Sequence, residues 1–370
     1  MLHFDRRVLN NFDWVTVLLV SLVSIMALAS LFSSTWNGGP NPSPLFFKQL
    51  YFFLFGYALI LLILSVDYSE LEMLAYVGYG AVCLLLIYTK LFVKAIAGSQ
   101  RWIDLGFFKL QPSEPTKLVL VLVLASCFAR LEAEEEGYGL RHLLRPAVLT
   151  SVPFLLIVIQ PDLGTALMLA FVCASMTLFA RLRWPALAML SGAGITTAVL
   201  GWLYGLKPYQ RRRIETFLDP ESDPMNHGYQ INQSKIAVGS GKLFGQGFME
   251  GTQGHLNFLP ERHTDFAFAV WCEELGFTGA VFYLICYFLL LLWGINIAMT
   301  ARDKFGVYLA FGIVTLIFWQ AVVNLSMIMG MLPVVGVPLP MFSYGGSSLL
   351  TNLIAVGILM SIRMRRFQKR

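Results

Sequence analysis

WVTVLLVSLVSIMALASLFS, residues 14–33, contains no charged side chain over its twenty positions. A helix needs about 20 predominantly apolar residues to cross the hydrocarbon core of a bilayer, so this stretch is long enough for one membrane span. The rest of the chain has the same character, because 57% of its residues are hydrophobic, 13% are charged and the mean hydropathy is +0.67. The composition therefore predicts an integral membrane protein.

Nine more apolar runs follow the first one along the chain. We predict ten spans, near residues 14–33, 50–66, 73–89, 113–130, 143–159, 162–180, 185–206, 266–297, 306–331 and 345–362. The alternating segments of about ten residues that a transmembrane barrel requires do not occur. The fifth run contains Pro153 and the eighth contains Glu273 and Glu274, so the boundaries of these two spans are the hardest to place. The predicted fold is an all-α polytopic membrane protein, with residues 1–370 as a single membrane domain.

The orientation follows from the basic residues, because short cytoplasmic connections are enriched in Lys and Arg. With the N-terminus inside, the cytoplasmic connections and chain ends carry 14 of the 27 basic residues, among them Arg6, Arg7 and Arg370. The short external connections carry only Lys48. We therefore expect both termini in the cytoplasm and one large extracytoplasmic loop over residues 207–265.

Three acidic residues, Glu114, Asp162 and Asp265, each lie at the external start of a predicted helix. Asp265 belongs to FLPERHTDFAFAV, residues 258–270, where a charged cluster runs directly into an apolar segment. Charged groups at the edge of a bilayer are costly unless they are paired, hydrated or used in function. Each acid alone could be a helix cap, but three on one side of the membrane also predict a site.

Two further groups of polar residues lie beside these acids. Glu114 and Lys117 are spaced i, i+3, which favours either a local salt bridge or a pair that also binds an anionic ligand. The preceding loop contains Arg101 and Trp102, and Trp102 could equally be an interfacial anchor.

The external loop contains a run of three arginines, Arg211, Arg212 and Arg213. Guanidinium groups match phosphate oxygens, so the run predicts contact with a phosphate-bearing ligand or with anionic lipid headgroups. The nearby GSGK, residues 239–242, is not a nucleotide-binding loop, because Ile236 replaces the first Gly and Leu243 replaces the required Ser or Thr.

The sequence gives little support for a dedicated metal site. His255, His263 and Asp265 lack the spacing of a helical zinc motif. An oxygen-ligated Mg²⁺ needs only one or two carboxylates plus substrate phosphates, so an ion carried by the substrate is compatible with the sequence. The five cysteines all fall within apolar runs and are expected to be small core residues.

From about residue 98 to its end, the chain resembles the SEDS family (shape, elongation, division and sporulation). The resemblance rests on a set of motifs in matching order: GSQRWIDLG, LQPSEPTKL, QPDLGTA, FLDPESDP, GYQINQSKIAVGSGKLFGQGF, FLPERHTDFAFAV, EELG and MLPVVGVPLPMFSYGGSS. Within it, PVVGVPLP is more similar to the elongation members of the family than to the division members.

The resemblance implies a peptidoglycan glycosyltransferase that polymerises lipid II, a disaccharide-peptide on undecaprenyl pyrophosphate, at the outer face of the cytoplasmic membrane. It implies Asp265 as the base or essential carboxylate and a divalent cation, Mg²⁺ or Mn²⁺, without an organic cofactor. Residues expected to contact the substrate are Arg101, Trp102, Glu114, Lys117, Asp162, Lys235, Arg262 and His263. The contact of Arg211, Arg212 and Arg213 with pyrophosphate is inferred from their charge.

The same resemblance implies a transpeptidase partner, a class B penicillin-binding protein, within the cell-elongation machinery, besides lipid II and membrane lipids; no nucleic acid is expected. Two alternatives stay open. A transporter that flips the lipid-linked precursor would also have many helices with polar ends. A noncatalytic scaffold would explain a partner but not the acids and arginines.

Overall fold

The computed structural model describes residues 11–36, 42–93, 101–106, 108–131, 137–205, 207–219, 221, 223, 227–252 and 258–367. The described residues do not include Arg6, Arg7 and Arg370, on which the predicted orientation partly rests, or His255.

A helix lies at each of the ten predicted spans. They are α2 (Trp14–Thr35), α3 (Pro44–Leu64), α4 (Tyr68–Phe92), α5 (Ser113–Ala129), α6 (Leu140–Ile159), α7 (Leu163–Phe179), α8 (Trp184–Leu200), α12 (Ala267–Met299), α13 (Lys304–Ile328) and α14 (Gly346–Met364). Seven helices of the described residues are long and apolar enough to cross a membrane. The other three, α5, α7 and α8, have 17 residues each, or about 26 Å at 1.5 Å per residue. The predicted all-α polytopic membrane fold is confirmed.

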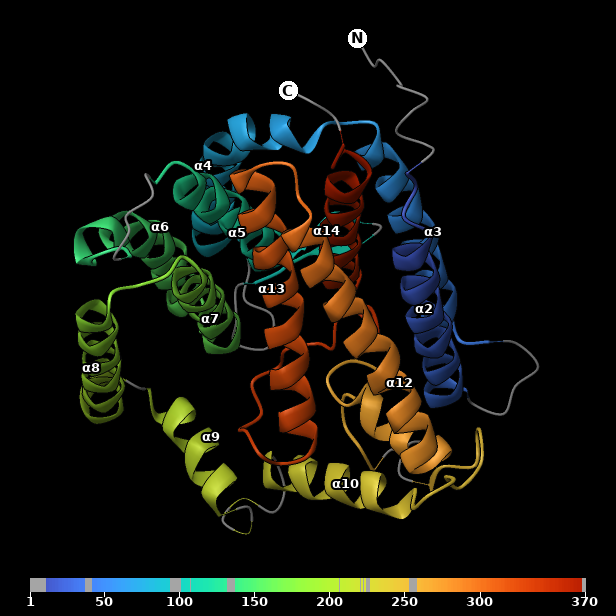
Figure 1. Ribbon diagram of the computed structural model, residues 1–370. Coiled ribbons are helices and arrows are strands. Elements are labelled where there is room, and N and C mark those ends of the chain that lie inside the picture. The colour runs from blue at the N-terminus through green and yellow to red at the C-terminus, as the bar shows by residue number, and fades with distance from the viewer. Residues whose placement is uncertain are drawn as a thin grey trace.

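The helices pack around α13. Both α5 and α12 pack along α13, α3 packs along α14, and α12 also contacts α2. In Figure 1, α2 and α3 lie on one side of α13, whereas α6, α7 and α8 lie on the other. In a bilayer, helices satisfy their own backbone polar groups, which leaves the side chains to pack against one another or against lipid.

Several helices begin at a side chain that caps the free backbone N–H groups of the first turn. Asp13 accepts a hydrogen bond from the backbone N of Thr16 at 3.2 Å. The same arrangement begins four other helices, where the capping residues are Ser43, Asp67, Asp162 and Asp303. The starts of these helices are therefore encoded locally.

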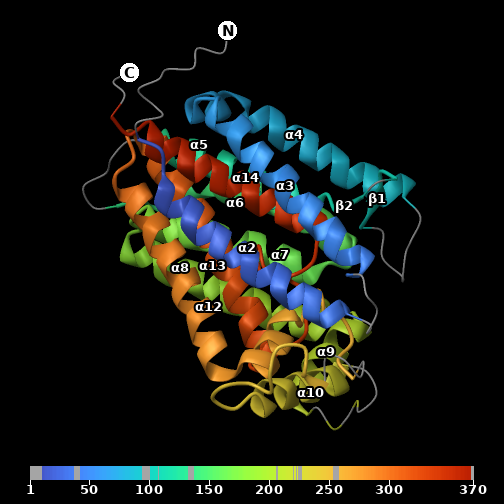
Figure 2. The same cartoon turned by 90° about the vertical axis from the view of Figure 1, so that its right-hand side faces the viewer.

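The beginning of α2 and the end of α14 lie at the same end of the bundle. Trp293 near the end of α12 donates from Nε1 to Asp13 Oδ1 at 3.0 Å. The guanidinium of Arg363 in α14 lies 5.0 Å from the centre of the Trp293 ring. We call this the termini end; α9 (Pro208–Leu218) and α10 (His227–Ser240) lie at the opposite end (Figures 1 and 2).

The predicted loops contain some regular structure. A short antiparallel hairpin pairs β1 (Ile103–Asp104) with β2 (Lys109–Leu110). The π-helix η1 (Gly201–Gly205) extends α8. In the segment predicted as the large loop, α10 packs against α9, α12 and α13.

The eighth predicted span, α12, contains a break that its apolar run does not indicate. Gly276 has φ 63° and ψ −159°, which divides α12 into a short first segment and a long second one. The break is bonded to the segment after α10, since the backbone N of Phe277 donates to the carbonyl of Lys242 at 2.9 Å. A left-handed φ is free of steric cost only for glycine, so Gly276 permits the break.

Gly276→Ala should destabilise this junction strongly. A Cβ at Gly276 would lie 2.3 Å from the backbone N of Gly245, and the left-handed backbone adds about 1–3 kcal/mol of strain. We expect a lower midpoint of thermal unfolding in detergent. Gly239→Ala is the control, because no atom lies within 4 Å of its added Cβ; equal midpoints for the two variants would contradict the proposed role of Gly276.

Candidate active site

Asp265 lies in the turn that precedes α12, and neighbouring segments hold its backbone in place. Asn324 of α13 donates from Nδ2 to the carbonyl of Asp265 at 2.9 Å and to the carbonyl of Val337 at 2.8 Å. A Cβ at Gly336 would lie 3.5 Å from Asp265 Oδ2. The connection between α13 and α14 therefore packs directly against the Asp265 carboxylate.

The electrostatic environment of Asp265 favours its protonated form. Burial raises the pKa of Asp265 to about 6; the charges of Glu261 and Asp162 act in the same direction, and Arg213 opposes them. A carboxylate whose pKa approaches the working pH is suited to general acid–base catalysis. This raised pKa is compatible with a general base, and the charges of Asp162 and Arg213 act on Asp265.

Asp162 is the centre of a second set of contacts. It caps α7 by accepting from the backbone N of Thr165 at 3.3 Å. Gln111 donates from Nε2 to Asp162 Oδ2 at 3.3 Å, and Arg101 Nη1 lies 3.8 Å from Asp162 Oδ1. Arg101 also donates to the carbonyls of Gln160, at 3.1 Å, and Pro161. The predicted cap is confirmed, and this cap also binds the loop that carries Arg101.

Glu114 and Lys117 form the predicted ion pair in the first turns of α5. Lys117 Nζ lies 2.8 Å from Glu114 Oε1. Both side chains are buried, at 1% and 3% exposure, and Glu114 Oε2 has no hydrogen-bond partner among the described residues. Gln111, which contacts Asp162, lies one turn before Glu114. The pair therefore adjoins the Asp162 cluster.

The structure separates the three arginines of α9. Arg213 acts on the charge of Asp265. Arg211 instead donates from Nη2 to the carbonyl of Leu203 at 2.8 Å, and Arg212 Nη2 lies 3.7 Å from Asp223 Oδ1. Of the run, Arg213 is the member whose charge acts on Asp265.

The remaining predicted contact residues lie in three other parts of the fold. Trp102 is partly buried just before β1. Lys235 of α10 packs over Gly330, whose added Cβ would lie 2.1 Å from Lys235 Cε. Arg262 and His263 line a cavity of about 530 Å³ between the turn at 259–263, the end of α2 and the start of α3. Cavities of this size are common ligand sites.

Two site residues, Gln111 and Asn324, were not anticipated from the sequence. Asn324 had a detectable signal, because a polar residue inside an apolar span is costly and is commonly functional. Gln111 had no such signal, since its contact with Asp162 depends on how α5 and α7 meet. Both residues position the predicted acids.

The described residues contain no group of three or more His, Cys, Asp or Glu side chains arranged to hold a metal ion. The charge of Asp162 nevertheless acts on Asp265. A single carboxylate such as Asp162 fits a Mg²⁺-type ion that takes its other ligands from substrate phosphates and water. The donor set is therefore compatible with the implied divalent cation.

A helical membrane bundle with acidic and basic groups gathered beside α7, α9 and α12 defines a multi-pass membrane protein with a polar site at one end. The sequence model of the cell cycle proteins FtsW, RodA and SpoVE matches residues 10–368. The peptidoglycan glycosyltransferase MrdB of Escherichia coli K12 is 40% identical over 310 residues, which cover 82% of this chain and 83% of MrdB.

Two solved structures have the same fold. A chain of a peptidoglycan synthase complex that coordinates polymerization and crosslinking has a TM-score of 0.81 and 32% identity, covering 97% of this chain and 99% of that one. The rod shape determining protein RodA of Thermus thermophilus has a TM-score of 0.71 and 30% identity, covering 97% and 98%. The chain belongs to the FtsW, RodA and SpoVE family of membrane peptidoglycan glycosyltransferases, as the motifs indicated.

Proposed function

We propose that this protein polymerises lipid II into glycan strands for cell elongation, with Asp265 as the base or essential carboxylate. The observation that carries this proposal is the environment of Asp265, a carboxylate whose burial raises its pKa to about 6 and on which the charges of Asp162 and Arg213 act. The chemistry needs a group that removes a proton from the acceptor sugar hydroxyl, and a carboxylate with a raised pKa meets that need.

The reaction balances as a single displacement. Asp265 accepts the proton of the acceptor hydroxyl while the hydroxyl oxygen bonds to the anomeric carbon of the donor sugar. The bond between that carbon and the pyrophosphate oxygen breaks, and undecaprenyl pyrophosphate leaves with the bonding electrons. One displacement inverts the anomeric carbon, and no covalent enzyme intermediate is required.

The leaving group carries negative charge that the site must stabilise. We assign this stabilising role to Arg213, because its charge acts on Asp265 and a guanidinium binds phosphate oxygens bidentately. A divalent cation, Mg²⁺ or Mn²⁺, would be held by Asp162 together with the phosphate oxygens of the substrate and would neutralise pyrophosphate when bound. Arg101 and Gln111 fix Asp162 for that purpose.

The proposed orientation puts this site outside the cell. Five arginines lie at the termini end, in or beside the short connections and the end of α14: Arg130, Arg145, Arg302, Arg363 and Arg365. Short connections rich in arginine face the cytoplasm. The site would then face the extracytoplasmic side of the cytoplasmic membrane, where the acceptor strand is.

A class B penicillin-binding protein is the proposed partner. A structural neighbour at 32% identity comes from a complex described as coordinating polymerization with crosslinking. A cell wall needs glycan strands to be both polymerised and crosslinked. The site described above contains groups for polymerisation, so crosslinking is assigned to the partner.

The test is polymerisation of purified lipid II by the detergent-solubilised chain with its transpeptidase partner, with and without Mg²⁺ or Mn²⁺. Glycan ladders separated by gel electrophoresis would support the proposal. A folded complex that forms no ladder but moves lipid II across vesicle membranes would support the flippase instead.

Polymerisation should increase with pH and level off above about pH 7. Asp265 acts as a base only when it is deprotonated, and its pKa is about 6, so activity should fall by about tenfold for each unit of pH well below that value. The measurement is the initial rate of strand formation between pH 5 and 8.5. A flat profile over that range would contradict the assignment of Asp265 as the base.

A further inference from the structure

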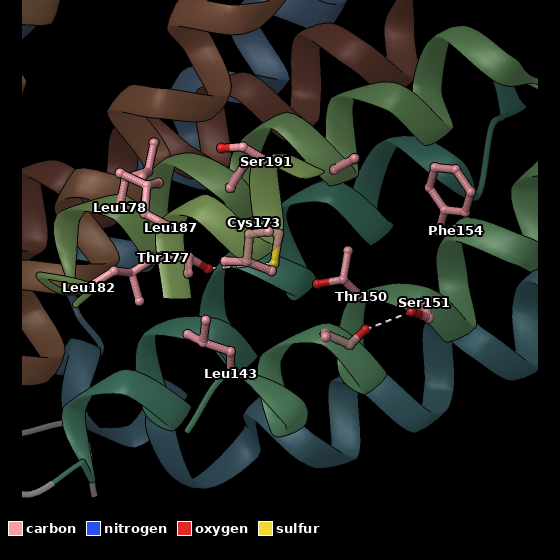
Figure 3. Close-up of a pocket in the computed structure, with 14 residues that line it drawn as sticks. Leu143, Thr150, Ser151, Phe154, Cys173, Thr177, Leu178, Leu182, Leu187 and Ser191 are labelled. Atoms are coloured by element: carbon pink, nitrogen blue, oxygen red, sulfur yellow. Dashed lines mark hydrogen bonds between the residues drawn. The ribbon is translucent and has the colours of Figure 1, made fainter. Parts of the chain in front are cut away.

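A second cavity, of about 510 Å³, lies between α6, α7 and α8, away from Asp265. Figure 3 shows side chains from these helices facing one another across it. Most of the lining is apolar, with small polar side chains among it. Representative lining residues are Leu143, Phe154, Cys173, Thr177 and Leu187.

The cavity exists because α8 is set apart from the bundle. Among the described elements, α8 packs closely only against η1, its own continuation. Side chains along it are largely exposed, including Trp184, Met189 and Leu190. A membrane-spanning helix separated from its neighbours must have hydrocarbon on every side, including the side that faces α7.

The depth of the cavity matches one leaflet of a bilayer. On α6 it extends from Leu143 to Phe154, which is about 16 Å at 1.5 Å per residue. Half of a hydrocarbon core about 30 Å thick is about 15 Å. Leu143 lies near the start of α6, and Leu182 lies in the connection between α7 and α8, so the cavity occupies the leaflet at the termini end.

Arginines border the cavity at that end. Arg181 and Arg183 flank the lining residue Leu182, and Arg141 lies in the first turn of α6; all three are exposed. The N-termini of α6 and α8 lie there too and add partial positive charge. Basic residues around a gap between membrane helices on the cytoplasmic side favour anionic lipid headgroups.

We propose that this cavity is a site for an anionic glycerophospholipid of the cytoplasmic leaflet. One acyl chain fills the space between α6, α7 and α8, and the phosphate lies at the arginines around Leu182. The bound lipid takes the place of the missing packing between α8 and α7. The inference rests on the proposed orientation of the protein but not on its proposed chemistry, and its test does not require activity.

The test is native mass spectrometry of the full chain in detergent, titrated with phosphatidylglycerol or with phosphatidylcholine of the same chains. We expect one phosphatidylglycerol to bind about tenfold more tightly than phosphatidylcholine, because only the anionic headgroup is attracted by the arginines. Ala174→Phe fills the cavity and should abolish that binding. Val148→Phe is the control on the same membrane region, since Val148 is exposed but does not line the cavity.

Arg181→Gln tests the headgroup separately. It should weaken phosphatidylglycerol binding about fivefold and leave phosphatidylcholine binding unchanged. Arg130→Gln, an exposed arginine at the same end that pairs with Glu72, should leave both unchanged. Equal binding of the two lipids, insensitivity to Ala174→Phe, or displacement of phosphatidylglycerol by undecaprenyl phosphate would overturn the proposal. Thermal unfolding of each variant separates lost binding from lost folding.

Discussion

Asp265→Asn lowers the rate of lipid II polymerisation by about 10²–10⁴-fold, the range expected when a positioned general base is removed. Asparagine keeps the size of the side chain but accepts no proton at neutral pH. The hydrogen bond from Asn324 to the carbonyl of residue 265 involves only the backbone, so the turn should remain in place. The measurement is the initial rate of strand formation with the transpeptidase partner present.

The control is Glu261→Gln, which removes a neighbouring carboxylate that raises the pKa of Asp265. It should retain activity and shift the pH–rate profile to lower pH. If Asp265→Asn kept more than about a tenth of the native rate, the carboxylate would not be the base.

Stability should respond in the opposite direction to activity. A carboxyl whose folded-state pKa is raised stabilises the fold fully below its unfolded pKa, 3.8, and loses that contribution as pH rises through about 6. At pH 8 the native chain therefore carries the cost of a charged, partly buried Asp265, and Asp265→Asn does not. We expect the variant to unfold at the same temperature as the native chain or higher, measured in detergent at pH 8.

The sequence was sufficient for the number and position of the ten membrane-type helices, but not for α9 and α10, which lie in the segment predicted as a loop. Ten apolar runs became ten helices, because each must satisfy its backbone within the bilayer. The local features could be predicted equally well, because the Asp162 cap and the Glu114–Lys117 pair each join residues three positions apart in the sequence. The break at Gly276 was missed, because it depends on long-range backbone hydrogen bonds such as the one from Phe277 to Lys242.

The site was predictable as a set of residues but not as an arrangement. Arg211, Arg212 and Arg213 are equivalent in the sequence, yet in the structure the charge of Arg213 acts on Asp265, whereas Arg211 contacts Leu203 and Arg212 contacts Asp223. Gln111 gained its role from the way α5 meets α7. Such contacts join residues far apart in the chain, and local patterns do not determine them.

Lys117→Met is expected to destabilise the protein by about 3–5 kcal/mol, the cost of leaving a buried charge without its partner. Both side chains of the pair are almost fully buried, and Nζ lies 2.8 Å from Glu114 Oε1. Methionine fills a similar volume, so the loss would come from the unpaired Glu114 rather than from a cavity. The measurement is thermal or denaturant unfolding in detergent.

An exposed pair supplies the control. Arg130 Nε lies 3.4 Å from Glu72 Oε1 with the arginine side chain 54% exposed, so Arg130→Met should cost only about 0–1 kcal/mol. Comparable losses for Lys117→Met and Arg130→Met would show that burial does not govern the strength of the Glu114–Lys117 pair.

The double variant Glu114→Gln/Lys117→Met decides what the pair does. Removing both charges should restore most of the stability, because a buried pair can often be replaced by uncharged groups at little cost. If polymerisation returns with stability, the pair only supports α5. If the double variant is stable but inactive, Glu114 and Lys117 act on the substrate, and Glu114 Oε2, which lacks a partner among the described residues, is the atom available for that contact.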